Sequence, residues 1–187
     1  MTGDLSIEQI SGQLNKTATE FITYCTSLSE EHFFYQPAEK WSAAQQVKHL
    51  ITATNTVSLA FRLPKFMVRM VGGKPNRDSR TYDELVAKYE LKLQEGGKAS
   101  SRYIPKPIHL SYGKERILKE FAKAMQQFST ALGRKWKEPQ PDRYIAPHPL
   151  LGKITLRELC YFTIHHTHHH LQSIKKIVPA SASSTHA

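Results

Sequence analysis

The sequence predicts an all-α fold: a four-helix bundle with an extra short helix and an irregular insertion between helices 2 and 3. Four long segments carry apolar residues at alternating spacings of three and four, which is the period of an amphipathic helix. No segment shows a convincing alternation of apolar and polar residues, the pattern of a half-buried strand. The 187 residues suffice for one domain with a sizeable core, which we place at residues 1–179.

The first two helices are recognised by their apolar stripes and by the prolines that follow them. The first is expected at residues 5–29, with the stripe Ile10, Leu14, Thr17, Phe21, Tyr24 and Leu28. Pro37 interrupts this pattern. The second helix begins at Trp41-Ser42, where Ser42 can cap it, and ends before Pro64. Its stripe is Val47, Leu50, Thr54, Val57 and Phe61.

The segment at about 64–112 is expected to be an insertion outside the core. It contains a short helix capped by Thr81, with Glu84 at the capping-box position, and consecutive glycines end that helix. Residues 98–112 include prolines and are predicted to be irregular, with short strands within 102–112 as the alternative.

A third long helix follows the insertion. It is predicted at about 113–134, with an inward stripe of Ile117, Phe121, Ala124, Phe128 and Leu132. Gly133 lies near its expected C-cap. The next residues, 137–153, are rich in proline and are predicted to form a linker.

The last helix is predicted to begin near Thr155, which forms a capping box with Glu158, and to run to about Val178. Pro179 stops it, because proline cannot continue a helix. The remaining residues, 180–187, are small and polar and are predicted to form a flexible tail.

The charge of the chain bears on its partners. The formal net charge is +10, and six basic residues lie between Arg62 and Arg80 against the single acid Asp78. This permits nucleic-acid binding. No interleaved aromatic residues mark the segment as a base-stacking platform, so a solvated basic loop is the simpler interpretation.

Two further classes are disfavoured by the composition. No apolar run approaches the length of a transmembrane helix, and residues 1–10 have neither the basic nor the apolar region of a secretory signal. Cys25 and Cys160 lie in separate apolar stretches, which indicates buried thiols rather than a disulfide framework. We therefore expect a cytoplasmic protein with no membrane span.

The last helix carries five histidines in six positions: His165, His166, His168, His169 and His170. On a helical wheel of about 100° per residue, the apolar residues of this helix occupy an arc of about 60°. His170 falls inside that arc and His166 about 20° beyond its edge. The other three point outwards or towards the flank, where surface chemistry is the simpler interpretation.

Two imidazoles four residues apart can bind one metal ion, but a third ligand is needed. His49 in the second helix is the candidate, beside the apolar stripe rather than within it. Three histidines would leave coordination positions open, as in catalytic metal sites. The alternative is a set of core histidines, each of which would need hydrogen-bond partners. Two further residues could approach the site: His148, if the linker folds over the helices, and Gln46, one turn before His49.

Two segments together resemble a known family. Residues 41–51, "WSAAQQVKHLI", carry a tryptophan and a serine followed by a central His-Leu. Residues 147–174 carry a Pro-x-x-Gly-x-Ile-Thr lead-in, then two histidines four apart, then a leucine. These segments resemble the second-helix and fourth-helix signatures of the DinB/YfiT-like four-helix bundles.

In that family, three histidines bind a divalent metal ion, one from the second helix and two from the fourth. The resemblance places these ligands at His49, His166 and His170. An alternative register would use His165 and His169, but the wheel turns that pair by about 100° away from the first. The ion would be Zn²⁺ or Ni²⁺, with Fe²⁺ as a further candidate.

The resemblance implies a metalloenzyme acting on a small-molecule substrate, because family members include thiol S-transferases that use low-molecular-weight thiols and a thiol-dependent isomerase. We therefore expect a metal-dependent thiol S-transferase or hydrolase. One alternative is a non-catalytic metal-binding or stress-response module, and a less favoured one is a basic nucleic-acid-binding protein. A homodimer is a further expectation. The insertion at 64–112 has no match in the resemblance, and it would shape a substrate pocket or a dimer contact.

Overall fold

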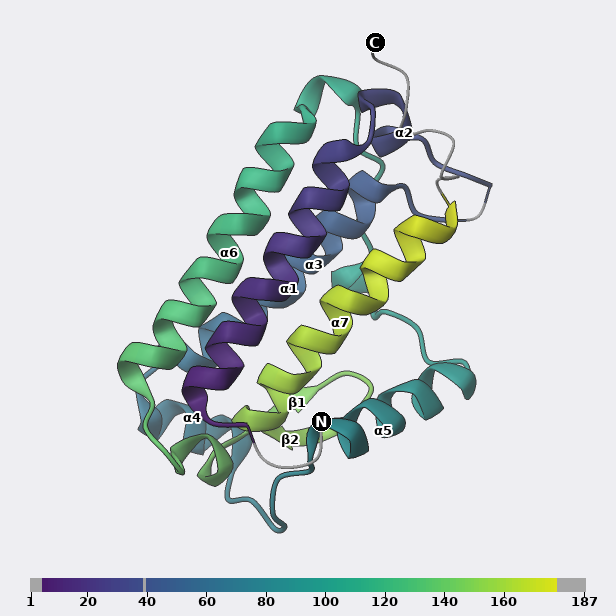
Figure 1. The fold of residues 1–187 in the computed structure, drawn as a ribbon. Helices are drawn as coiled ribbons and strands as arrows, with labels where there is room; N and C mark the ends of the chain where they lie inside the picture. The colour runs from purple at the N-terminus through teal and green to yellow at the C-terminus, as the bar shows by residue number, and fades with distance from the viewer. Residues whose placement is uncertain (1–4, 39, 178–187) are drawn as a thin grey trace.

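The computed structural model of the protein describes residues 5–38 and 40–177. Within these residues the chain is mostly helical and contains a small two-stranded sheet (Figure 1). The prediction of an all-α protein is therefore right for the long elements and wrong for this hairpin. The predicted helix end at Val178, the stop at Pro179 and the tail at 180–187 lie outside the described residues. Among the described helices, none combines the length and apolar content that a membrane span requires.

Four long helices lie alongside one another: α1 (Ile7–Ser27), α3 (Ala43–Arg62), α6 (Lys114–Lys135) and α7 (Leu156–Ile177). α1 and α3 each pack against both α6 and α7, so the order around the group is α1, α6, α3, α7. The ends of α1, α3 and α6 and the start of α7 agree with the predicted long helices to within about two residues.

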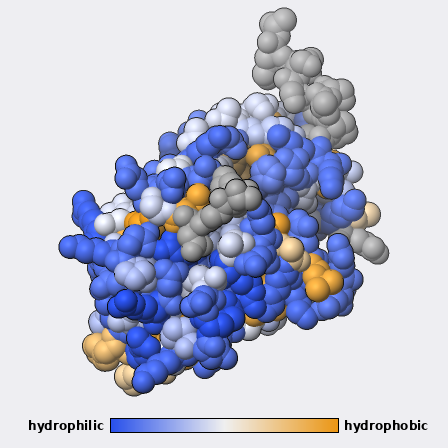
Figure 2. Space-filling model, turned by 60° about the horizontal axis from the view of Figure 1, so that its bottom comes forward, coloured by the Kyte–Doolittle hydropathy of each residue, from blue (hydrophilic) through white to orange (hydrophobic). Residues whose placement is uncertain are grey.

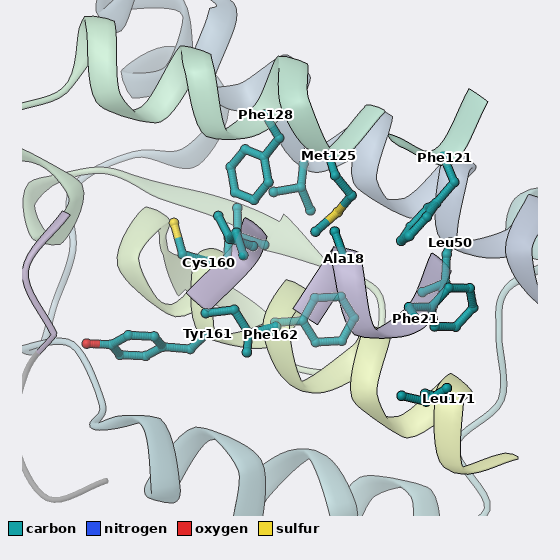
Figure 3. Close-up of a cluster of buried hydrophobic side chains, with 14 of the residues drawn as sticks. Ala18, Phe21, Leu50, Phe121, Met125, Phe128, Cys160, Tyr161, Phe162 and Leu171 are labelled. Carbon is teal, nitrogen blue, oxygen red and sulfur yellow. The ribbon is translucent and has the colours of Figure 1, made fainter. Parts of the chain in front are cut away.

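The core lies between these four helices. The predicted apolar stripes of α3 and α6 are buried. Phe21 of α1 and Phe121 of α6 pack with their ring centroids 5.1 Å apart (Figure 3). Burying each such ring contributes about 2–3 kcal/mol, because it removes apolar surface from water. Helices α3 and α7 also pack against each other, and these two helices carry the histidines discussed below.

The predicted N-caps are confirmed. Ser42 begins α3 and Thr81 begins α5 (Tyr82–Gln94), each with a complete capping box. At the start of α7, the Glu158 N–H donates to Oγ1 of Thr155 at 3.2 Å, and the Thr155 N–H donates to the Glu158 carboxylate at 2.7 Å. These bonds satisfy N–H groups that the first helical turn leaves unpaired, so they set where each helix begins.

Two short helices were not predicted. They are α2 (Glu30–Phe34) and α4 (Lys65–Gly72), and α4 replaces part of the predicted basic loop. With five and eight residues, they are too short to show a clear period. At the end of α4, a Cβ on Gly72 would lie 1.8 Å from the carbonyl oxygen of Ile145, so this close approach requires glycine. The predicted C-cap near Gly133 is wrong, because α6 continues past it.

The hairpin lies in the segment predicted to be a proline-rich linker. β1 (Ile145–His148) pairs antiparallel with β2 (Gly152–Thr155), which leads directly into α7. Gly152 has a φ of +72°, a left-handed conformation that favours glycine. Prolines at 147 and 149 hide the alternation in so short a strand, which is why the sequence pattern did not reveal it.

The insertion is more closely integrated than predicted. Within 102–112 the structure has no strand, and the segment is shaped by two 3₁₀ turns, η1 (Ser101–Tyr103) and η2 (Leu110–Tyr112). Helix α5 packs along α7, where the Tyr89 ring lies edge-on to Phe162 with centroids 5.3 Å apart. The expectation that the whole insertion lies outside the core is therefore wrong for α5, which covers one side of α7.

Candidate metal centre

Three histidines from two neighbouring helices meet in the interior. His49 lies on α3, His166 and His170 lie one turn apart on α7, and all three are buried. Nε2 of His166 is 3.1 Å from Nε2 of His49 and 3.1 Å from Nε2 of His170. Each residue offers one ring nitrogen to the group, and these three atoms lie within 4.8 Å of one another. The structure thus brings together the three residues that the sequence selected.

The alternative histidine pair is not part of this group of three, although His169 packs against His170 with centroids 5.3 Å apart. His165 and His169 are on the side of α7 that Tyr89 of α5 covers. His165 Nε2 is 3.8 Å from a carboxylate oxygen of Glu90 and forms no hydrogen bond within the described part of the chain. His168 is exposed. None of these residues belongs to the cluster of three around His166.

The imidazole of His49 is oriented by the main chain of the insertion. Its Nδ1 is 2.7 Å from the backbone carbonyl oxygen of Tyr103 in η1. A carbonyl oxygen can only accept, so Nδ1 carries the proton and donates it. The lone pair of the neutral ring is therefore on Nε2, which faces His166. Trp41 packs against the same ring with centroids 5.1 Å apart.

The imidazole of His170 is oriented by α3. Its Nδ1 is 2.9 Å from Oε1 of Gln46, and the Gln46 amide nitrogen donates to the backbone oxygen of Trp41 at 3.4 Å. Because the amide donates through its nitrogen, its oxygen is the atom that accepts from His170. The proton of His170 is thus on Nδ1, and its Nε2 also presents a lone pair to the centre of the cluster. The interpretation of Gln46 as a residue next to a ligand agrees with this contact.

The electrostatics of the cluster favour neutral imidazoles. Burial lowers the pKa of His49, and it lowers the pKa of His166 and His170 well below the usual value, with the neighbouring imidazoles adding to the effect. Neutral imidazole is the form that binds metal ions. With lone pairs on Nε2 of both His49 and His170, the single N–H of a neutral His166 can satisfy only one of them.

The spacing and chemistry of the donors fit a divalent metal ion. Bonds of about 2.0–2.1 Å to zinc, at tetrahedral or octahedral angles, place neighbouring nitrogens about 2.8–3.4 Å apart. The two Nε2–Nε2 distances of 3.1 Å fall in this range. Imidazole nitrogens suit zinc, nickel and iron alike, so the donor set does not select among them.

A cavity of about 500 Å³ opens beside the three histidines. Most of its lining is apolar and comes from α3, α7 and the hairpin, while the exposed cations Lys98 and Arg102 of the insertion line it as well. Among the described residues, no carboxylate lines this cavity. The arrangement can hold a small, largely apolar molecule next to the cluster and can attract an anionic group on it.

His148 of β1 lies in the wall of this cavity. The backbone N–H groups of Leu150 and Leu151 donate to its Nδ1 at 3.2 and 3.1 Å, so the proton of the neutral ring sits on Nε2. Burial lowers the pKa of His148 to about 4, which keeps the ring neutral at pH 7. The ring packs against Phe162, which in turn stacks on His166. The hairpin therefore brings His148 to the site, although the simpler interpretation of the sequence left it in a loop.

Part of the basic segment between Arg62 and Arg80 forms ion pairs within the protein. Arg77 and Arg80 each form an ion pair of 2.9 Å with the fully buried carboxylate of Glu158. These ion pairs, together with the cap at Thr155, attach the insertion to the start of α7. Two of the cations that suggested nucleic-acid binding are thus engaged inside the protein.

Comparison with protein families identifies the family of the chain. The family model of the DinB superfamily matches residues 13–174, a range that includes His49, His166 and His170. The chain belongs to the DinB superfamily. Comparisons with curated proteins and with solved structures gave no match.

Sequence reasoning missed the residues that orient or cover the ligands through distant contacts. The Tyr103 carbonyl belongs to the main chain and lies 54 residues from His49, so no side-chain pattern marks it. Tyr89 lies on a helix that the sequence placed outside the core. In this DinB superfamily chain, the signal that could have revealed Tyr89 is the apolar stripe of α5 itself.

Proposed function

We propose that this protein is a metal-dependent enzyme whose divalent ion is held by Nε2 of His49, His166 and His170. The observation that carries the proposal is the convergence of three neutral imidazoles beside an apolar cavity. Zn²⁺ and Ni²⁺ are the first candidates and Fe²⁺ the next. The four long helices would then be the four-helix bundle of the family, within one domain at residues 1–179.

The reaction that the site supports best is thiol S-transfer. A divalent ion, when bound, lowers the pKa of a thiol or water at its open position and so supplies a nucleophile near neutral pH. Lys98 and Arg102 would bind the carboxylate of a low-molecular-weight thiol, because both are exposed cations in the cavity lining. The apolar part of the cavity would hold a small electrophile next to that thiol and exclude water from it.

His148 supports the reaction as a neutral hydrogen-bond donor. Its Nδ1 is used by two backbone N–H groups, so its Nε2–H is the group left for an oxygen atom of the substrate. Because burial keeps its pKa at about 4, the donor stays neutral and does not add charge beside the ion. Phe162 positions this ring through a contact of 4.3 Å between centroids.

Hydrolysis is the second candidate reaction. The cavity lining favours thiol transfer over hydrolysis, because it includes no carboxylate, among the described residues, that could take a proton from water. A thiol has an unperturbed pKa of about 8.5 and water about 15.7, so a thiol ionises far more readily without a protein base.

Metal content tests the site. Untagged, dialysed wild-type protein is compared by elemental analysis with His49→Ala, His166→Ala and His170→Ala. His168→Ala is the matched control, because this residue lies on the same helix and is exposed. We expect about one ion per chain in the wild type and the control, and loss in the other three variants. Equal metal in all five proteins, or none in any, would contradict the three-histidine site.

Activity of the metal-loaded protein tests the reaction. A panel of low-molecular-weight thiols with small apolar electrophiles, and a parallel panel of esters and amides, separates S-transfer from hydrolysis. Metal that is retained without turnover on either panel would favour a non-catalytic metal-binding or stress-response module. A homodimer also stays a prediction, and sedimentation velocity would test it.

A further inference from the structure

Helix α4 exposes an apolar face. At about 100° per residue, four of its apolar side chains fall within an arc of about 140°. Their exposed fractions are 66% for Phe66, 39% for Met67, 79% for Met70 and 64% for Val71. On the opposite side of the helix, Val68 and Gly72 are buried. The apolar stripe that packs against the rest of the protein is thus narrow, and a wider apolar face is open to solvent.

Cations surround this face. Arg62 at the end of α3 and Lys74 just past α4 are exposed, and neither takes part in an ion pair within the described residues. Lys65 and Arg69 of α4 lie over aromatic rings at 5.3 and 4.8 Å. Lys153 of β2 reaches Gly73 at the end of the helix. This end of the molecule therefore combines apolar side chains with a ring of positive charge.

Two acidic residues of the segment after α6 are engaged elsewhere. Glu138 and Asp142 both pair with Arg157, a buried residue of α7. Figure 2 shows apolar side chains at the lower left of the surface among hydrophilic ones, on the side where Figure 1 places α4. Exposed apolar groups of this kind, rimmed by polar residues, mark interaction surfaces.

The same helix borders the cavity. Val68 and Val71 of α4, together with Leu63 just before it, line the cavity that opens on the three histidines. Val71 belongs both to the exposed apolar face and to this lining. The apolar face of α4 is therefore continuous with the apolar wall of the cavity.

We propose that α4 docks this protein onto an anionic membrane surface. Phe66, Met70 and Val71 enter the boundary between headgroups and acyl chains, while the surrounding cations meet the lipid phosphates. Docked in this way, the cavity opens next to the bilayer, so an apolar substrate can reach the histidines from the lipid. The docking itself does not depend on the metal and goes beyond the proposed function.

Two other occupants of this face are less well matched to it. A second copy of the chain would bring the same cations against one another, and the whole chain already carries a net charge of +10. A nucleic acid would match the cations but would leave the apolar side chains of α4 without apolar partners. An anionic lipid surface matches both.

Vesicle co-sedimentation tests the proposal. The full chain is mixed with vesicles of phosphatidylcholine alone or with about one-third phosphatidylserine. We expect binding to the anionic vesicles only, reduced at least about tenfold in the double variant Phe66→Ser/Met70→Ser. Leu91→Ser/Leu110→Ser is the matched control, because both leucines are 52% exposed and lie outside α4. No binding to anionic vesicles, or equal binding by both double variants, would overturn the proposal.

A second pair of variants tests the charges. Arg62→Gln/Lys74→Gln should weaken vesicle binding and its salt dependence, whereas Lys119→Gln/Lys123→Gln on α6 changes the net charge equally and should not. This pair decides the question if the apolar variant fails to fold. His166→Ala should bind vesicles as the wild type does, which separates this result from the metal site.

The competing occupants have their own readouts. Self-association that the Phe66→Ser/Met70→Ser variant abolishes would assign the face to a second copy and overturn the proposal. Binding to a DNA duplex that is tighter than binding to anionic vesicles, and unchanged in that variant, would also overturn it, because the cations alone would then carry the interaction.

Discussion

Gln46 on α3 accepts a hydrogen bond of 2.9 Å from Nδ1 of His170 on α7. Both residues are buried, and they lie 124 positions apart in the sequence. The contact fixes the tautomer of the imidazole and turns its Nε2 towards His49 and His166. If His170 binds a metal ion as proposed, an amide on one helix thus orients a ligand on the next, as residues outside the ligand shell do in known metal sites.

Replacing Gln46 should weaken metal binding without touching a ligand. In Gln46→Leu the acceptor is lost, and we expect the metal affinity to fall about 10–100-fold. Gln46→Glu should keep most of the affinity, because a carboxylate also accepts from Nδ1–H. Competition with a chromophoric chelator measures both. Gln172→Leu is the control, since Gln172 is exposed and its side chain bonds to the exposed His168, and an equal loss in this control would refute the role of Gln46.

The metal-free protein should lose stability in acid partly through His148. Burial lowers its pKa to about 4, below that of the unfolded chain at about 6.5. As the pH falls below 6.5, the unfolded chain therefore takes up a proton that the folded chain does not, and the free energy of unfolding decreases. Between pH 7 and 4 this amounts to about 3 kcal/mol.

The variant His148→Gln isolates that contribution. Its side-chain oxygen can still accept from the N–H groups of Leu150 and Leu151, but it does not titrate. Urea unfolding at several pH values should give a shallower acid decline for the variant than for the wild type. Parallel curves for the two proteins would show that His148 is not held neutral by burial.

Removing the Glu158 carboxylate should strongly lower the free energy of unfolding. Its carboxylate is fully buried, pairs with Arg77 and Arg80 and caps α7 through the Thr155 N–H. We expect Glu158→Ala to lower the free energy of unfolding by about 3–5 kcal/mol. Glu115→Ala removes an exposed ion pair with Lys119 and should cost about 0.5 kcal/mol or less. Thermal or urea unfolding compares them, and similar losses in both variants would contradict this account.

The two cysteines should not react with thiol reagents in the folded protein. Cys25 and Cys160 are buried and unpaired, and burial raises the pKa of Cys25 to about 12 and that of Cys160 further. Thiolate is the reactive form, so labelling requires unfolding. A chromogenic disulfide reagent should detect no thiol in native protein and both thiols in denaturant. Rapid labelling under native conditions would show that one of these helices opens.

The parts of the fold that the sequence predicted are those with a long local period. The stripes of α3 and α6 each extend over about four turns, so the buried side of each helix follows from the chain itself. His166 and His170 were separated from His165 and His169 by the same phase argument. For those two histidines, the burial that the wheel predicted is the burial that the structure shows.

The parts that the sequence did not predict depend on contacts between distant segments. The hairpin at 145–155 is too short for an alternating pattern, and its place is fixed by α4 packing against β1. The covering of α7 by Tyr89 depends on where α5 docks. The position of His148 in the cavity wall follows from that hairpin, so neither could be read from local spacing.

The bond between His49 and the Tyr103 carbonyl makes the orientation of one imidazole depend on a loop that can be re-engineered. Because the acceptor belongs to the main chain, no substitution of the Tyr103 side chain removes it, whereas lengthening or shortening the 98–112 loop would displace it. Chimeras that keep all three histidines and exchange only this loop would therefore differ in how firmly one imidazole is aimed. Changes in this loop, rather than in the histidines, would then adjust the metal affinity in small steps.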